Sequence, residues 1–132
     1  MIYVGTKENA PHCTMPAPYQ RELYCLLSPS LDPTQHDLAV GMVEIPAGST
    51  SDWRAHEEGE MFFVVSGHGH MRVGEEVIAL QPDMALYVPG GVPHQSINDS
   101  PSGEVLKELF VLTPPFGGDR SIIENARIQQ EG

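Results

Sequence analysis

The chain is poor in cysteine, in basic side chains and in long apolar runs, and each shortage excludes a class of protein. Its 132 residues include two cysteines, too few for the disulfide framework of a small secreted domain. Seven Lys and Arg against 18 Asp and Glu give a net charge of −11, which repels nucleic acid and anionic membranes. No apolar run approaches the roughly 18 residues that cross a bilayer. We therefore expect neither a nucleic-acid partner nor a membrane partner.

The first residues also lack the features of a secretory signal peptide. Residues 1–16 contain no basic region followed by a long apolar stretch and a small-residue cleavage site. Cys13 and Cys25 do not form a Cys-x-x-Cys motif. We therefore expect two reduced thiols and a cytoplasmic location.

A recurring pattern of short apolar segments predicts an all-β domain. Segments rich in Val, Ile, Leu, Phe and Tyr return about every ten residues, separated by Gly, Pro, Asn or Asp, as in a β-sandwich or barrel. Eight strands suit a double-sheet jelly roll. The predicted strands cover residues 22–27, 38–45, 60–65, 70–73, 77–80, 85–88, 94–98 and 104–112.

We expect one domain with three parts: residues 1–36 as an N-terminal arm and first strand, 37–113 as the barrel core, and 114–132 as a tail. Residues 10–18 hold three prolines and predict an arm or loop, whereas the apolar spacing after Asp119 predicts a short C-terminal helix. The apolar run 61–65 indicates a strand covered on both faces. A homodimer is the favoured source of that cover, and the folded-back chain ends are the alternative.

Three residues form a candidate metal site. His56 and Glu60 are four residues apart beside the turn signal Glu58-Gly59, and His94 follows 34 residues after Glu60, behind a Pro-Gly-Gly turn. Two hairpins could bring all three onto one atom. Two imidazoles and one carboxylate can hold a divalent metal and leave coordination positions open. A small-molecule site on a β scaffold is therefore the leading hypothesis.

These residues lie in a pattern that resembles the first motif of the cupin superfamily. That motif runs glycine, five residues, His-x-His, three or four residues, Glu, six residues, glycine. The chain has Gly48, His56, Glu60 and Gly67 at these places, with Arg54 at the first histidine position. An arginine stays protonated and has no lone pair for a metal. The resemblance therefore implies a metal site that lacks one of its usual four ligands.

The second cupin motif is also matched. It runs glycine, five residues, Pro-x-Gly, two residues, His, three residues, Asn. The chain has Pro89, Gly91, His94 and Asn98 at these places, with Asp83 instead of the leading glycine. The resemblance implies a double-stranded β-helix barrel, the fold of the superfamily.

The remaining ligand set resembles the facial triad of non-haem iron oxygenases. It implies a cupin metalloenzyme that acts on a small polar or anionic metabolite, with Fe2+ favoured and Mn2+, Ni2+ or Zn2+ as alternatives. A dioxygenase, an oxidoreductase, is favoured over a decarboxylase, lyase or isomerase. The alternatives are a non-catalytic binding or sensing module and a metal-independent lyase or isomerase, because one fold hosts many reactions.

Two further residues are candidates for a catalytic role. Arg54 could clamp a substrate carboxylate or could be a surface residue paired with a nearby acid. Tyr87 precedes Val88-Pro89 in the second motif, near His94, and its hydroxyl could donate a proton or orient the substrate. His68 and His70 share a strand face and are expected at the rim, with replacement of the missing ligand as the alternative. Trp53 either covers the cavity or anchors a turn.

Overall fold

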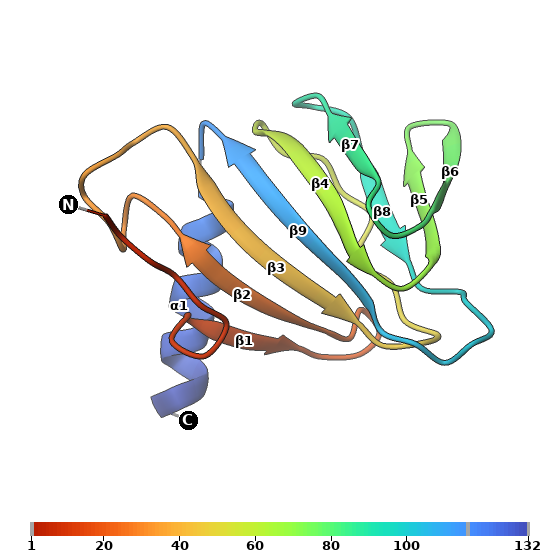
Figure 1. Ribbon diagram of the computed structural model, residues 1–132, viewed down its shortest axis with the longest axis horizontal. Coiled ribbons are helices and arrows are strands. Elements are labelled where there is room, and N and C mark those ends of the chain that lie inside the picture. Colours follow the sequence, from red (N-terminus) through yellow and green to blue (C-terminus); the bar gives the residue numbers. More distant parts are fainter. Residues whose placement is uncertain (1, 116, 132) are drawn as a thin grey trace.

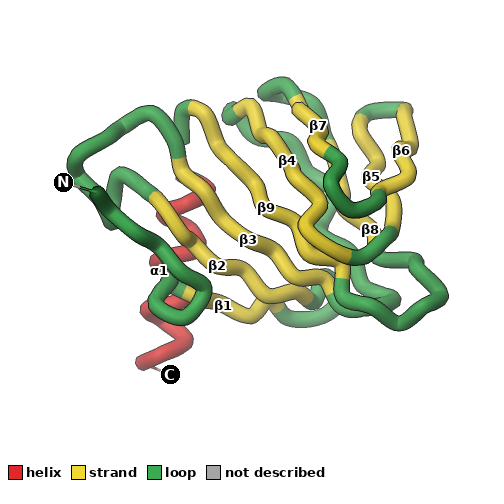
Figure 2. The backbone as a smooth tube through the Cα atoms, viewed as in Figure 1, coloured by secondary structure: helices red, strands yellow, loops and turns green. Residues whose placement is uncertain are grey.

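The computed structural model describes residues 2–115 and 117–131 and contains two antiparallel β-sheets and one helix (Figure 1). The larger sheet has the order β1-β2-β3-β9-β4-β7, and the smaller has the order β6-β5-β8. The strands and loops can be followed in Figure 2. The elements are β1 (His12–Met15), β2 (Arg21–Leu27), β3 (Ala39–Ile45), β4 (Gly59–Ser66), β5 (Gly69–Val73), β6 (Glu76–Leu80), β7 (Ala85–Val88), β8 (His94–Ile97), β9 (Leu106–Thr113) and α1 (Gly118–Glu131). This arrangement confirms the predicted double-stranded β-helix barrel.

Alternation along the central strands explains how the sheet encloses an interior. Along β3 and β9 every second residue is buried, so each strand has one inward face. The inward residues of β9 are Leu106, Glu108, Phe110 and Leu112, of which three are apolar. Burial of these apolar faces supplies the main favourable free energy of folding. One inward position of β9 is nevertheless a carboxylic acid.

An additional stretch of backbone pairing joins the two cupin-like motifs. After β3 the chain runs beside β8, with antiparallel bridges between Thr50 and Ile97 and between Arg54 and His94. The Arg54 amide donates to the His94 carbonyl at 3.3 Å, and the His94 amide donates to the Arg54 carbonyl at 3.1 Å. This pairing brings the first motif directly beside the second.

Two turns in these motifs require a left-handed backbone. Gly48 and Gly91 have φ values of 82° and 83°, and a Cβ at either position would meet no neighbouring atom. Conformation rather than space therefore favours glycine there. Asp83, which stands where the second motif has a glycine, has a φ of 69°. Aspartate tolerates this region better than most residues, so the departure from the motif preserves its turn.

The N-terminal arm contains a strand that the sequence pattern did not predict. β1 lies between Pro11 and Pro16 and pairs with β2 at the edge of the larger sheet. Proline is compatible with an edge position because it removes an amide that a central strand would need. The prolines led us to expect an arm or loop, and the structure has a short strand between Pro11 and Pro16.

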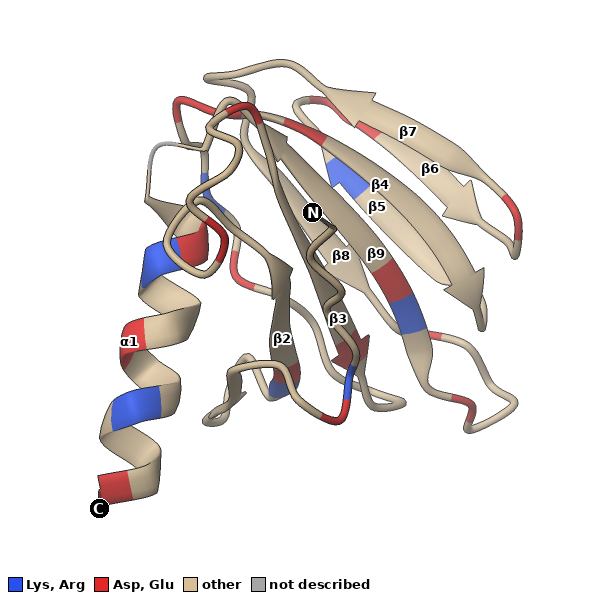
Figure 3. Ribbon diagram, turned by 60° about the vertical axis from the view of Figure 1, so that its left-hand side comes forward, with Lys and Arg blue, Asp and Glu red and all other residues tan. Residues whose placement is uncertain are grey.

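Helix α1 packs against β1, β2 and β3, as the views in Figures 1 and 3 show. Its buried residues Ile122 and Ala126 are four apart and share one face of the helix. Its outer face carries charged residues, among them Arg127, which pairs with Glu124 and Glu131. The predicted C-terminal helix is thus present. Within the described ranges, no helix combines the length and apolar character that crossing a bilayer demands.

Candidate metal centre

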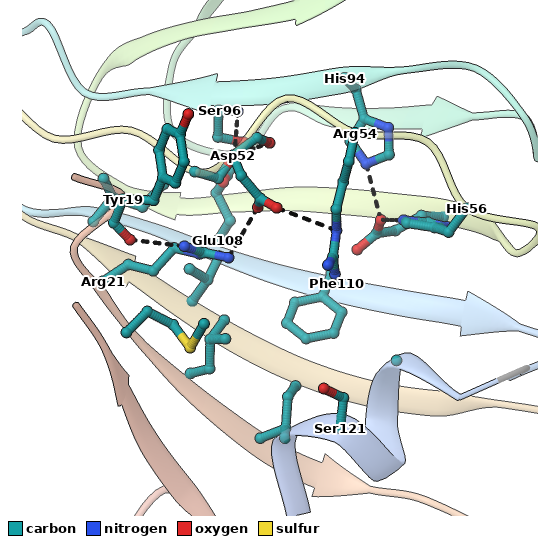
Figure 4. A pocket seen from close by; sticks show the side chains of 18 of the residues that line it. Tyr19, Arg21, Asp52, Arg54, His56, His94, Ser96, Glu108, Phe110 and Ser121 are labelled. Carbon is teal, nitrogen blue, oxygen red and sulfur yellow. Dashed lines mark hydrogen bonds and ion pairs between the residues drawn. The ribbon is translucent and has the colours of Figure 1, made fainter. Parts of the chain in front are cut away.

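His56, Glu60 and His94 come together inside the barrel (Figure 4). His56 lies in the loop before β4, Glu60 is the second residue of β4, and His94 begins β8. One ligand atom from each lies within 4.8 Å of the others. His56 Nε2 is 2.9 Å and His94 Nε2 is 3.2 Å from the same Glu60 oxygen, Oε1. The structure therefore brings together the three residues that the sequence indicated as ligands.

Backbone carbonyls orient both imidazole rings. His56 Nδ1 lies 3.1 Å from the Glu58 carbonyl, and His94 Nδ1 lies 3.0 Å from the Val92 carbonyl. A carbonyl can only accept a hydrogen bond, so Nδ1 carries the proton in each ring. In a neutral imidazole this leaves the Nε2 lone pair directed at the centre. Ligating histidines in proteins are usually held in this way, so the donor set fits a divalent metal.

The charges of the three residues are coupled. Burial raises the pKa of Glu60, but hydrogen bonds and charges from His56 and His94 outweigh it and hold the pKa below its usual range. The hydrogen bond to Glu60 raises the pKa of His56, against the opposing effect of burial. Glu60 is therefore a carboxylate, the form that binds metals.

Glu58 connects this centre to helix α1. Its side chain is buried, with Oε1 3.4 Å from His56 Nδ1 and Oε2 accepting from the Gly118 amide at 3.2 Å. A carboxylate at a helix N-terminus is stabilised by the unpaired amides and by the helix dipole. The Glu58 side chain therefore contacts both the His56 ring and the start of α1.

A cavity of about 800 Å³ opens beside the three residues. Its apolar walls come from the inward faces of the larger sheet, and residues 15–19 with the start of α1 line it as well. Most small-molecule sites combine apolar walls with a few polar groups in this way. The polar and charged lining includes Arg21, Ser51, Asp52, Arg54, Glu57, Glu58, Ser96 and Glu108.

Arg54 and Tyr87 have different positions relative to this cavity. Arg54 lines it with a side chain that is 61% exposed, and its Nε is 3.6 Å from Asp52. The pair with an acid is the second of the two sequence-based alternatives, whereas a role in binding a substrate carboxylate stays a prediction. Tyr87 is 62% exposed and does not line the cavity. It pairs with Met61, between the inward positions of Glu60 and Phe62, so it belongs to the outer face.

The other aromatic and histidine candidates also lie outside the cavity lining. His70 Nδ1 is 2.8 Å from Asp99, and His68 is paired with Glu104. Trp53 is covered by Arg72, whose guanidinium is 4.4 Å from the ring centre. Among the described residues, the candidate metal ligands are therefore His56, Glu60 and His94.

Two cavity residues were missed by sequence reasoning. Arg21 is buried and donates to the Tyr19 carbonyl at 2.7 Å and to Asp52 at 3.1 Å. Glu108 is fully buried on β9. Its signal was present in the sequence, since it occupies an inward position in the alternation of Leu106, Phe110 and Leu112. Arg21 had no such signal, because only folding brings it opposite Asp52.

Comparison with known proteins places this architecture in a family. Residues 41–107 match the model of the cupin domain, a stretch that includes both motifs. The chain belongs to the cupin family. An uncharacterised protein of Streptomyces coelicolor is 35% identical over 81 residues, which cover 61% of this chain and 74% of that protein.

Solved structures share the same cupin fold. A predicted oxalate decarboxylase of Thermotoga maritima has a TM-score of 0.73 and 16% identity, with 86% of this chain and 100% of that chain covered. The structure of FeII HppE has a TM-score of 0.69 and 18% identity, with 84% of this chain and 60% of that chain covered. At these identities the likeness establishes the fold alone.

Glu108 makes the stability of the protein depend on pH in a defined direction. Burial, together with the Glu60 charge, raises the pKa of Glu108 to about 7 against the opposing effects of Ser96 and His94. Its stabilising contribution is complete below the unfolded pKa, near 4.5, and is lost as pH rises through the folded pKa. The loss is on the order of 3 kcal/mol.

We compare the free energy of unfolding of Glu108→Gln with that of the native protein. We expect this difference to favour the variant more at pH 8 than at pH 5. Gln keeps the size and polarity of the side chain but cannot ionise. Urea unfolding of both proteins across this range measures the difference, in which all other titrating groups cancel. A difference that does not change between pH 5 and 8 would show that Glu108 has an ordinary pKa.

Proposed function

We propose that this cupin is a metal-dependent enzyme that acts on a small polar or anionic metabolite, with an oxygenase-type reaction at a divalent ion held by His56, Glu60 and His94. The observation that carries the proposal is the convergence of the three ligand atoms within 4.8 Å, beside a cavity large enough for a metabolite. Fe2+ is the favoured ion because two histidines and one carboxylate form the facial triad of non-haem iron sites.

The residues around the centre have separable roles. The Glu58 and Val92 carbonyls hold the two rings in position, and Phe62 packs its ring edge-on against His94 with centroids 5.6 Å apart. Such fixed surroundings keep the donor set in place and limit the access of water. A bound ion would supply Lewis-acid or redox chemistry to a substrate oxygen. Arg54, exposed at the cavity, has guanidinium donors that can bind an anionic substrate group.

A binding module without catalytic activity is the second candidate. The observation that favours it is Arg54, which occupies a ligand position of the family motif. Metal analysis separates the two functions if the protein is purified without a chelating resin. The enzyme proposal predicts bound metal and, at an ion concentration 100 times Kd, about 2.7 kcal/mol of added stability. No metal and no change in melting with iron, manganese, nickel or zinc would leave the binding module. The homodimer and the cytoplasmic location stay predictions from the sequence.

Replacement of Glu60 by Gln tests the ligand set. The amide is neutral and cannot provide the charge that the site needs, so we expect the metal content to fall roughly tenfold or more. Glu57→Gln is the matched control, since it makes the same chemical change at an exposed position three residues away. Elemental analysis of both variants measures the effect. Retention of metal by Glu60→Gln would exclude Glu60 as a ligand.

Replacement of Arg54 by His tests whether position 54 faces the centre. Arg54 and His94 form a cross-strand pair, and paired residues point to the same side of a sheet. We therefore expect Arg54→His to supply a further nitrogen ligand and to raise metal affinity severalfold, measured by competition with a chromogenic chelator. Arg54→Leu removes the positive charge without adding a ligand. Equal affinities of the His and Leu variants would mean that this position does not reach the metal.

A further inference from the structure

Glu108 is a buried acid without a visible structural purpose. Its relative exposure is 0%, and neither carboxyl oxygen has a hydrogen-bond partner among the described residues. The neighbouring Ser96 hydroxyl affects its pKa but falls short of a hydrogen bond. Burial of a polar group without a partner costs free energy, so such a group in a native fold calls for an explanation.

Other buried acids of this chain show what a structural role involves. Asp119 is 4% exposed and accepts a hydrogen bond from the Ser28 hydroxyl, which ties α1 to the chain after β2. Asp32 accepts from the amide and hydroxyl of Thr34. Glu108 makes no comparable bond, although an apolar side chain at this position would continue the inward face of β9. Ligand binding therefore explains the carboxyl group of Glu108 better than a role in the fold does.

The cavity is where that ligand would lie. Glu108 lines the same cavity as the metal candidates, and Figure 4 shows it among the lining residues with Ser96 and Phe110. The two arginines of the cavity are both engaged with Asp52, Arg21 at 3.1 Å and Arg54 at 3.6 Å. Neither arginine therefore balances a negative charge on Glu108, and the opposing effect of His94 does not offset its burial. Under these conditions a carboxyl group is more stable in its neutral form, which can both donate and accept a hydrogen bond.

The register separates Glu108 from the metal candidates along the cavity. Glu60 of β4 lies opposite Leu112 of β9, whereas Val64 lies opposite Glu108. The four intervening steps correspond to roughly 13 Å of strand. Glu60 and Glu108 therefore lie at two separate positions along the inward face of the larger sheet, and both line the cavity.

We propose that Glu108 is a specificity-determining residue, which binds an uncharged hydroxyl or carbonyl group at the far end of a ligand whose oxygen donor lies at the metal centre. This inference rests on the proposed function for its metal end only. The substrate class is then a short-chain acid with a second, uncharged polar group. An alkyl group there would leave the buried carboxyl unpaired, and a site built for hydrogen bonding discriminates strongly against such an analogue.

Matched straight-chain acids test the proposal. The probes are butanoate, pentanoate and hexanoate and their terminal hydroxy and amino derivatives, titrated calorimetrically into the zinc-loaded protein. We expect the best hydroxy acid to bind roughly tenfold more tightly than its alkyl partner, because only the hydroxyl group pairs with Glu108. Equal binding of the two at every chain length would overturn the proposal. A preference for the terminal amino derivatives would also overturn the proposal, because it would show that Glu108 is a charged carboxylate that binds a cation.

Two variants separate recognition from folding. Glu108→Gln keeps a donor and an acceptor and should retain the preference for the hydroxy acid. Glu108→Met has a similar length without hydrogen-bonding groups and should bind the hydroxy and alkyl acids equally. Loss of the preference in both variants, or in neither, would contradict the assigned role.

Two readouts without activity keep this inference distinct from the proposed function. The infrared band of a protonated carboxyl group should be present in the metal-free protein at pH 6 and should be missing from Glu108→Gln. Its absence from the native protein would count against Glu108 alone. Metal content, measured separately for each protein, reports on the metal centre. If no metal is bound, the infrared result for Glu108 can still be interpreted.

Discussion

The antiparallel pairing between the segment after β3 and strand β8 is the constraint on which the site depends. It sets Arg54 directly across from His94, and His56 follows Arg54 by two residues. The larger sheet then fixes Glu60 on the inward face of β4 through its pairs with β7 and β9. A ligand from each sheet and one from the connecting loop meet only because this backbone pairing closes the barrel. The closure of the barrel therefore determines the relative positions of the three side chains.

The same closure creates an interior in which charges must be balanced one by one. Glu60 is balanced by His56 and His94, and Arg21 by Asp52. Glu108 is the exception, and its raised pKa is the physical result of burial without a partner. The metal candidates and Glu108 thus place carboxyl groups at two positions along the inward face of the larger sheet. This distribution suits an elongated ligand with an oxygen group at each end.

The sequence predicted the convergence of His56, Glu60 and His94 because motif spacing follows from turn geometry. The turns at Gly48 and Gly91 have left-handed backbone, and Asp83 adopts the conformation of the glycine that it replaces. Strand positions were also predictable, because alternation is visible in any sequence that has an inward face. Features that depend on strand pairing were not predictable. The prolines on either side of β1 argued against a strand there, and only the register of β4 and β7 assigns Tyr87 to the outer face. Arg21 meets Asp52 only through the folded chain.

A crystal structure of the metal-loaded protein, with anomalous scattering recorded at the absorption edge of the added ion, tests the central claim most directly. The account predicts one anomalous peak bonded to His56 Nε2, His94 Nε2 and a Glu60 carboxylate oxygen, at about 2.0–2.2 Å from each. Density bonded to none of these atoms, or a peak at another site with the three residues still hydrogen-bonded to one another, would contradict it.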